Sequence, residues 1–191
     1  VYKRGIEDFI ISDASSNTVT FAVLGGKIVG AIDAPIFAPG LMQGPLDVEA
    51  IRDVDSGKVT ANQAFSKGGI LRKLGQKKLE ECSPDERLFA LESLALFAAM
   101  EIGAMEVLAR DLKVLDPSIY LAGSPAGLIC ERVSGLLGKR ALALGRCEAA
   151  VGCAMIAEDV FLGKDEILGI KVDGRVRGFS CPRHGISAEP L

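Results

Sequence analysis

A glycine pair between two strand-like runs restricts how the chain can begin to fold. Residues 18–24 and 27–33 are rich in β-branched and apolar side chains, and they flank Gly25-Gly26. Glycine accepts the positive φ angles that tight hairpin turns require, so the two runs are predicted to form a hairpin. A third apolar run, residues 9–13, precedes them and ends in Asp13, as a buried strand does where it meets solvent. The chain is therefore expected to begin with three successive antiparallel strands.

Beyond these strands, helix and strand patterns alternate. A capping box at Ser83-Pro84-Asp85-Glu86 starts a long helix that extends to about Leu112. Its wide apolar face comprises Leu88, Leu91, Ala95, Ala98, Ala99, Ile102 and Met105. The pattern continues with strands at 119–122, 140–145 and 167–172 and helices at 126–137 and 148–162. This predicts an α/β fold with a mixed sheet, in which three antiparallel strands are followed by alternating helices and parallel strands.

The segment between the hairpin and the long helix is irregular at first. Pro35 to Pro45 holds too many prolines and glycines for regular structure but is apolar, so we expect it to pack against the rest of the protein. Pro45 is expected in the first turn of a helix that continues to Asp55, and a second short helix is expected at 61–66. Residues 1–173 are expected to form one domain, and residues 174–191 an extended or expression-derived tail.

Charge and composition argue against several classes of function. The net charge is −3, from 22 basic and 25 acidic residues, and such a field opposes a polyanion, so no nucleic-acid partner is expected. The longest uncharged stretch, Pro117 to Cys130, is too short and too broken to span a bilayer, and no signal peptide is visible. Five cysteines without a Cys-x-x-Cys pair favour reduced thiols. We expect a cytoplasmic protein without a membrane partner.

The first segment that could carry chemistry is Asp13-Ala14-Ser15-Ser16-Asn17-Thr18. It places an acid at a strand end, followed by small hydroxyl and amide residues in a tight turn. Such a turn can offer N–H groups and hydroxyls to a phosphate, while an acid such as Asp13 holds Mg²⁺, usually through water. An ordinary Asx-turn in a hairpin has the same local sequence, and taken alone the segment favours that interpretation.

Two further segments lie where helices are expected to start. Gly123-Ser124-Pro125-Ala126-Gly127 joins a strand to a helix, and such a turn can accept an anion or let a flat ring approach the backbone. Glu148 to Ala154 is dominated by small residues, which leave room for a ligand or for close packing. Many strand-to-helix turns bind nothing, and core packing explains the small residues equally well. The sequence contains neither a Walker loop nor a Gly-x-Gly-x-x-Gly motif.

Together, the strand order and these three segments resemble the C-terminal domain of the acetate kinase, sugar kinase and actin superfamily, over residues 9–162. The resemblance implies a ribonuclease-H-like domain and an ATP site in a cleft between two such domains. It implies that Asp13 is catalytic and organises Mg²⁺ through water. It also assigns phosphate binding to Ser15, Ser16, Asn17 and Thr18, and adenosine binding to Gly123, Ser124, Pro125, Glu148 and Gly152.

Within that superfamily, Gly40-Leu41-Met42-Gln43-Gly44 is similar to a loop of acetate and butyrate kinases that follows the same hairpin. More narrowly, residues 12–18, 44–47 and 60–62 resemble the methanogenesis marker 12 family, an archaeal group related to those kinases. The chain departs from the kinase pattern, because Ala14 and Ser15 replace glycines and Leu46 replaces a catalytic arginine. Leucine cannot supply charge to a transferring phosphoryl group, although Arg52, about one helical turn later, could reach inward.

These observations favour the ATP- and magnesium-binding half of a phosphotransferase-like protein related to acetate and butyrate kinases. It would be a kinase or an ATPase with an unknown phosphoryl acceptor, and its cleft would need an N-terminal partner domain or a second chain. The alternative is a non-catalytic scaffold or regulatory protein that retains the fold. A weaker third hypothesis makes Cys147 and Cys153 a redox pair, although six positions along a helix do not place two side chains together. The apolar loop and the long helix would also suit a homodimer.

Overall fold

The structure, a computed structural model, describes residues 1–173. Its strands are β1 (Phe9–Ala14), β2 (Thr18–Leu24), β3 (Lys27–Ile32), β4 (Ser118–Ala122), β5 (Ala141–Ala143), β6 (Glu166–Ile167) and β7 (Ile170–Lys171). Its α-helices are α1 (Val48–Asp55), α2 (Ala61–Lys67), α3 (Ile70–Lys73), α4 (Pro84–Asp111), α5 (Ala126–Leu137) and α6 (Glu148–Phe161). Two 3-10 turns complete the described elements, η1 (Tyr2–Arg4) and η2 (Leu79–Glu81).

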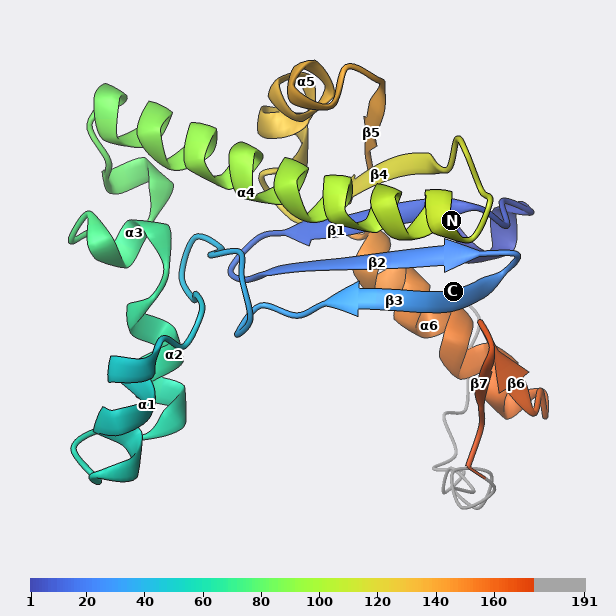
Figure 1. The fold of residues 1–191 in the computed structure, drawn as a ribbon, viewed down its shortest axis with the longest axis horizontal. Coiled ribbons are helices and arrows are strands. Elements are labelled where there is room, and N and C mark those ends of the chain that lie inside the picture. Colours follow the sequence, from blue (N-terminus) through green and yellow to red (C-terminus); the bar gives the residue numbers. More distant parts are fainter. Residues whose placement is uncertain (174–191) are drawn as a thin grey trace, which may run out of the picture.

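One mixed sheet holds β1 to β5 in the order β3-β2-β1-β4-β5 (Figure 1). The central strand β1 pairs antiparallel with β2 and parallel with β4, and β4 pairs parallel with β5. β2 pairs antiparallel with β3 and has a bulge at Ala22 and Val23. This order is that of a ribonuclease-H-like domain, so the expected α/β class with a mixed sheet is confirmed.

Helix α4 lies across one face of the sheet and starts at the expected capping box. The Ser83 hydroxyl accepts a hydrogen bond from the Glu86 N–H, while the Glu86 carboxylate accepts one from the Ser83 N–H. Helix α5 packs beside α4 on the same face (Figure 1). The two helices are joined by ion pairs at their solvent edge, such as that between Arg132 and Glu92.

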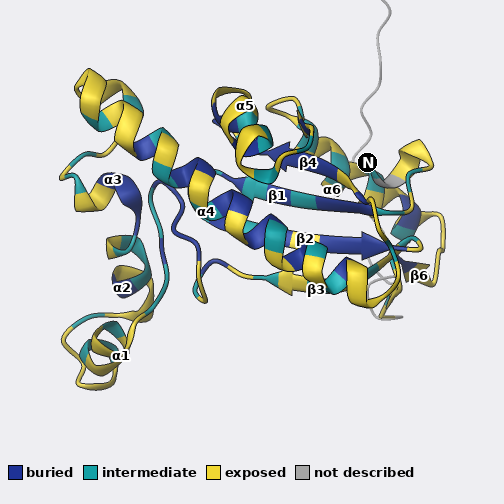
Figure 2. Cartoon of the chain, turned by 45° about the horizontal axis from the view of Figure 1, so that its top comes forward, coloured by how far each residue is buried: buried dark blue, intermediate teal, exposed yellow. Residues whose placement is uncertain are grey.

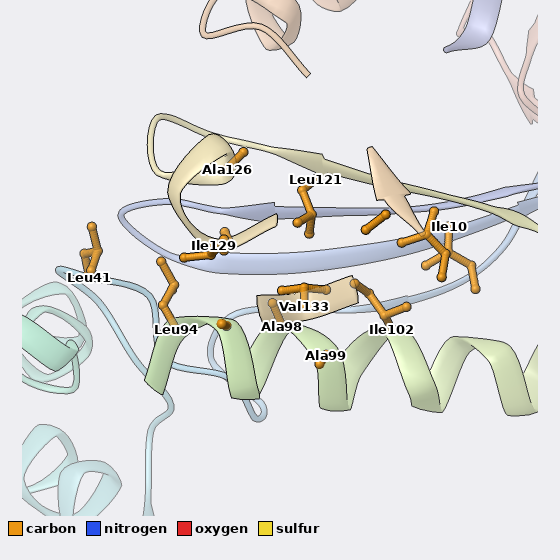
Figure 3. Packing of buried hydrophobic residues seen from close by; sticks show 14 of the residues in the cluster. Ile10, Leu41, Leu94, Ala98, Ala99, Ile102, Leu121, Ala126, Ile129 and Val133 are labelled. Carbon is orange, nitrogen blue, oxygen red and sulfur yellow. The ribbon is translucent and has the colours of Figure 1, made fainter. Parts of the chain in front are cut away.

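The main core lies between α4 and the sheet. Figure 3 shows Leu94, Ala98 and Ile102 of α4 directed at the sheet, where Ile10 and Leu121 meet them. All five side chains are fully buried. Leu88, expected on this apolar face, is instead 61% exposed, because the inward positions near the start of the helix are Ala90 and Leu94.

The opposite face of the sheet is less completely covered. It carries a smaller cluster in which the rings of Phe9 and Tyr120 meet edge to face, with centroids 6.1 Å apart. Helix α6 lies on this side, but Asp159 is the one residue of α6 that is buried. Lys3 of η1 pairs with Asp159 at 3.1 Å and with Glu158 at 2.7 Å. Ion pairs therefore connect α6 to the N-terminal segment.

Three short helices, α1 to α3, extend the molecule beyond one end of the sheet (Figure 1). The Asp47 carboxylate accepts a hydrogen bond from the Ala50 N–H and caps α1, so Pro45 precedes the helix and the expectation that it lies in the first turn is wrong. The second expected helix is present as α2. Thr60 caps it, again in a capping box, with Gln63 as the partner.

The C-terminal part differs from expectation in two places. The strand expected at 167–172 is a hairpin of the short strands β6 and β7 in a separate sheet. Leu168 and Gly169 both have positive φ angles, 50° and 81°, which turn the chain back on itself. The strand expected at 140–145 is limited to Ala141–Ala143. The tail expected at 174–191 lies outside the described residues.

Helix α4 is long and apolar enough, by length and composition alone, to cross a membrane. Glu92 and Glu101 interrupt its sequence, which is why uncharged stretches do not reveal it. In the structure its inner side is buried against the sheet, as in the core helix of a soluble protein.

Candidate functional site

The carboxyl ends of β1, β3, β4 and β5 lie at the same edge of the sheet. β1, β4 and β5 are parallel, and β3 runs in the same direction because both it and β1 are antiparallel to β2. In open α/β sheets, ligands bind outside the carboxyl ends of the strands. The loops after β1 and β4, and helix α6 after β5, contain the three segments singled out from the sequence.

Asp13 and Gly123 meet at this edge. Asp13 lies in register with Ala122, and its Oδ1 accepts a hydrogen bond of 2.8 Å from Ser15 Oγ. Gly123 has a φ of 98°, and a Cβ built on it would lie 2.9 Å from both Asp13 Oδ1 and the Ala14 carbonyl oxygen. Only glycine fits this close approach, and it brings the predicted phosphate and adenosine segments into contact.

The turn between β1 and β2 is fixed from outside by the Gly40–Gln43 segment. The N–H of Leu41 donates to the Ser15 carbonyl at 2.8 Å, and the N–H groups of Met42 and Gln43 both donate to the Ser16 carbonyl at 2.9 Å. The expectation that the apolar 35–45 segment is packed is therefore confirmed from Ala38 to Leu41, which are buried, whereas Ile36 and Phe37 are 72% and 37% exposed.

The hydroxyl-bearing residues of the turn differ in their accessibility. Thr18 is fully buried, and its hydroxyl donates to the Pro39 carbonyl at 3.1 Å, so its side chain secures the loop. Ser16 is exposed, and its N–H and hydroxyl donate to no group within residues 1–173. Of the four residues assigned to phosphate, Ser16 is thus the most open to a ligand, while Asn17 packs its backbone against Gly40.

A cavity of about 340 Å³ lies between the sheet and α6, on the face opposite α4. Asp13 and Ala122 line it from the sheet, and Glu148 and Gly152 line it from α6, so three of the predicted site residues share one cavity. The rest of its wall is mostly apolar: Val1, Phe9, Ile11, Phe21, Val23, Ile28, Leu144, Ala149, Cys153, Ile156 and Leu168.

The remaining adenosine candidates lie beside this cavity and do not line it. Ser124 is exposed, whereas Pro125 is buried and caps the start of α5. Gly123 directly follows the cavity residue Ala122, so it lies between the residues that line the cavity and those that lie beside it. Cys147 and Cys153 are both free and exposed, so the structure contains no bond between them.

A buried carboxyl on α4, Glu101, was missed by the sequence analysis. The Glu101 Oε2 lies 2.6 Å from Thr20 Oγ1, which lies 2.9 Å from Ser12 Oγ, and all three residues are fully buried. Glu101 Oε1 has no hydrogen-bond partner among the described residues. Burial raises the pKa of Glu101 to about 7, with Asp33 adding to the rise, while Thr20 and the Ala38 N–H oppose it.

The hydrogen-bonded residues Ser12, Thr20 and Glu101 are connected to the candidate site through residues next to them in the sequence. Ser12 precedes Asp13, and Ala38 precedes the loop that fixes the β1–β2 turn. The signal that could have revealed Glu101 is its position directly before Ile102 on the apolar face of the long helix. A charged residue at that position is either at the edge of the buried face or buried for a specific structural or functional reason.

Three solved structures are similar to the chain at a low level. Acetate kinase from Entamoeba histolytica matches with a TM-score of 0.44 and 14% identity, over 77% of this chain and 39% of that one. ROK hexokinase from Thermus thermophilus matches with a TM-score of 0.33 and 21% identity, over 80% and 59%. The ethanolamine utilization protein EutJ from Carboxydothermus hydrogenoformans matches with a TM-score of 0.30 and 19% identity, over 73% and 44%. The fold class itself follows from the strand order of this chain.

Similarity in sequence is much higher to a set of archaeal proteins, although no family model matches the chain. A UPF0285 protein of Methanosarcina mazei is 49% identical over 177 residues, which is 88% of this chain and 54% of the relative. UPF0285 proteins of Methanococcus maripaludis and Methanocaldococcus jannaschii are 42% and 39% identical, over 88% of this chain and 55% of each relative. The homologues of this chain are thus archaeal UPF0285 proteins, and the chain spans about half the length of these curated relatives.

Proposed function

We propose that this chain is the ATP- and magnesium-binding half of a phosphotransferase-like protein related to acetate and butyrate kinases. The observation that carries the proposal is the contact between Gly123 and Asp13 at the carboxyl edge of the sheet. It joins an acid at a strand end to a glycine turn before a helix, which are the parts that a bound nucleotide needs on this side of a cleft.

Different residues of the site would hold the magnesium ion, the phosphates and the adenosine. Asp13 would hold Mg²⁺ through water, because carboxylate oxygens and water are the ligands that this ion prefers. Ser16 would donate its free N–H and hydroxyl to a phosphate, and the apolar cavity beside Glu148 and Gly152 would take the adenosine. The described residues that line this cavity include no lysine or arginine, so the ion would supply the positive charge that the phosphates need.

The phosphoryl acceptor and the partner half belong to the same proposal. Leu46 cannot take the part of the catalytic arginine of acetate kinases, and the guanidinium of Arg52 pairs with Glu49 on the same helix at 2.6 Å. The missing charge would therefore come from an N-terminal partner domain or from a second chain that closes the cleft. A cytoplasmic location and a link with methanogenesis remain part of what we propose.

Thermal unfolding of this chain together with its proposed partner half, with Mg²⁺ and ATP or ADP, tests the binding part of the proposal. A ligand that binds the folded state raises its melting temperature, so we expect a rise with MgATP that EDTA reverses. Asp13→Asn should abolish the rise, whereas Asp111→Asn, an exposed acid at the end of α4, should leave it unchanged. If MgATP produced no rise, or the same rise in Asp13→Asn, this proposal would be wrong.

A non-catalytic scaffold is the second candidate function. The specific observation in its favour is Ala14, which is fully buried where kinases carry a glycine, together with Leu46. A scaffold would bind its partner and complement a deletion strain equally well as the Asp13→Ala variant. Loss of complementation by a folded Asp13→Ala protein would favour the nucleotide-dependent function.

A further inference from the structure

Helix α4 carries a line of apolar side chains on the side that faces away from the sheet. Phe89, Leu96, Met100 and Val107 are 58%, 45%, 48% and 58% exposed, and we call these four residues the outer stripe. With 3.6 residues per turn, all four lie within about 40° of one another around the helix. Figure 2 shows exposed residues recurring along this helix, between the buried ones that meet the sheet. The stripe is thus a line of exposed apolar side chains, interrupted at Ser93 and Gly103, with no partner among the described residues.

The spacing of the outer stripe is that of a helix-to-helix seam. Its residues are separated by seven, four and seven positions, which fits the alternating spacing of three and four in a coiled coil when Ser93 and Gly103 occupy the two intermediate positions. The stripe spans about 27 Å at 1.5 Å per residue, long enough for several layers of side chains. An isolated surface apolar residue needs no explanation, but a regular series of this length indicates a partner.

The stripe is also symmetric about residue 98, and this symmetry specifies the partner. In an antiparallel pair centred there, Phe89 would face Val107 of a second copy, and Leu96 would face Met100. A two-fold axis would generate each of these contacts twice. The outer stripe would therefore be complementary to itself, as a C2 interface requires. A helix from an unrelated protein would not impose this symmetry.

Small residues on the same side would let two such helices approach closely. Ser93 and Gly103 flank the stripe, and they too lie at equal distances from residue 98. A Cβ built on Gly103 would meet no atom within 4 Å, so packing inside the described chain does not require a glycine there. The space that Gly103 leaves is on the outside of the helix.

Charge favours the antiparallel arrangement over the parallel one. Asp85 begins α4 and Arg110 is near its end, so antiparallel helices would bring Arg110 close to Asp85 of the second copy. The helix dipoles would also run in opposite directions, which places the positive end of one helix beside the negative end of the other. On the side toward α5, Glu92 and Glu106 are already neutralised by Arg132 and Lys139.

We propose that the outer stripe of α4 is the contact surface of an antiparallel homodimer with two-fold symmetry. This inference does not depend on nucleotide binding, because the stripe and the cavity that contains Asp13 are on opposite faces of the sheet. In the dimer the two cavities would lie on the faces of the sheets that are turned away from the shared helices, so each copy would keep its own cavity open.

Analytical ultracentrifugation of the 191-residue chain at micromolar concentration tests the proposal. We expect a dimer for the wild type and a monomer for Leu96→Glu/Met100→Glu, because each glutamate would face an apolar or acidic side chain of the other copy. Leu88→Glu is the matched control for the single change Leu96→Glu, since each adds one glutamate at an exposed leucine of α4 (61% and 45% exposed), and Leu88→Glu should remain dimeric. Circular dichroism checks that each variant is folded. A monomeric wild type, or a dimer that survives the double change, would overturn the proposal.

Disulfide trapping determines the orientation of the two helices. Phe89→Cys mixed with Val107→Cys should give a crosslink between positions 89 and 107 on oxidation, identified by peptide mass spectrometry because the chain has native cysteines. Phe89→Cys alone should not crosslink to itself through position 89, because the two positions would be about 27 Å apart. A 89-to-89 crosslink would indicate a parallel pair and overturn the antiparallel arrangement.

Flotation with phosphatidylcholine vesicles separates the dimer from a membrane contact. The wild-type chain should stay unbound. Binding that is lost in Leu96→Glu/Met100→Glu would show that the stripe meets lipid instead of a second copy, and would overturn the proposal.

Discussion

At the scale of single residues, the buried carboxyl of Glu101 is the feature that most needs a physical explanation. Its carboxyl is fully buried, and the hydroxyl of Thr20 is within hydrogen-bond distance of both Glu101 and Ser12. One hydroxyl proton can serve only one of these acceptors. A protonated Glu101 can donate to Thr20 while Thr20 donates to Ser12, and an ionised Glu101 can accept from Thr20 while Thr20 accepts from Ser12, so burial and not the hydrogen-bond chain favours the neutral acid.

The pH dependence of stability should reveal this proton. The pKa of Glu101 is raised from its ordinary value of 4.5 to about 7, so between these values the folded state holds a proton that the unfolded state releases. The contribution of Glu101 to stability is therefore full below about pH 4.5, falls as pH rises and is lost above about pH 7, by roughly 3 kcal/mol at most. Glu101→Gln should remove this fall. Urea unfolding of both proteins from pH 5 to 8.5 measures how the free energy of unfolding depends on pH. The same pH dependence in the wild type and in Glu101→Gln would contradict the prediction.

At the scale of elements, backbone contacts attach the helical extension α1–α3 to the site. Gly40 and Leu41 accept hydrogen bonds from the N–H groups of Ile70 and Leu71 at the start of α3, while the same segment fixes the β1–β2 turn. The carbonyl of Phe65 in α2 accepts from the Gly44 N–H. A movement of α2 and α3 would therefore be transmitted to the turn that contains Ser16.

Gly40→Ala should weaken this attachment. A Cβ at position 40 would come within 2.5 Å of the Asn17 nitrogen and of the Ser16 oxygen, and backbone cannot move aside as a flexible side chain can. We expect a loss of about 2 kcal/mol in the free energy of unfolding, typical of overpacking. Gly135→Ala, on an exposed position of α5 with open space around it, should instead stabilise the protein slightly. Equal effects of the two changes in urea unfolding would argue against the steric explanation.

The elements that the sequence predicts correctly are those with strong local signals. The capping box of Ser83 and the Gly25-Gly26 turn are each specified within a few residues, and α4 and the β2–β3 hairpin follow from them. The capping box of Thr60 at the start of α2 was seen only in the structure. The β6–β7 turn was missed although Gly169 marks it, because its other residue with positive φ is a leucine, Leu168, which is typical of a strand interior. The partner of Asp13 was inferred only through the resemblance, because its contact with Gly123 depends on the pairing of strands distant in sequence.

At the scale of the whole molecule, the two faces of the sheet are covered unequally. α4 and α5 bury their inner sides in the core, whereas α6 buries Asp159 alone and relies on ion pairs with η1. The side chain of Asp159 is only 3% exposed and contacts both Lys3 and Lys164. The cavity that contains Asp13 therefore lies under the helix that is held least firmly by apolar packing.

Lys3→Ala should loosen α6 without unfolding the protein. The hydrogen bonds of Lys3 to Glu158 and Asp159 raise its pKa, so the charged side chain stabilises this contact. Hydrogen exchange followed by mass spectrometry should show faster exchange in α6 and an unchanged rate in α4. Lys58→Ala, which breaks a similar ion pair with Asp53 near α1, is the control and should leave α6 unaffected. Unchanged exchange in α6 of Lys3→Ala would show that other contacts hold this helix.

The central position of β1 also has a consequence during synthesis on the ribosome. β1 can pair with β2 as soon as the first hairpin emerges, but its other edge must wait for β4, about a hundred residues later. At the usual speed of translation, that edge stays open for on the order of ten seconds. Open strand edges are sites of aggregation. The nascent chain therefore passes through a period in which protection of this edge, for example by a chaperone, decides how much of it reaches the folded state.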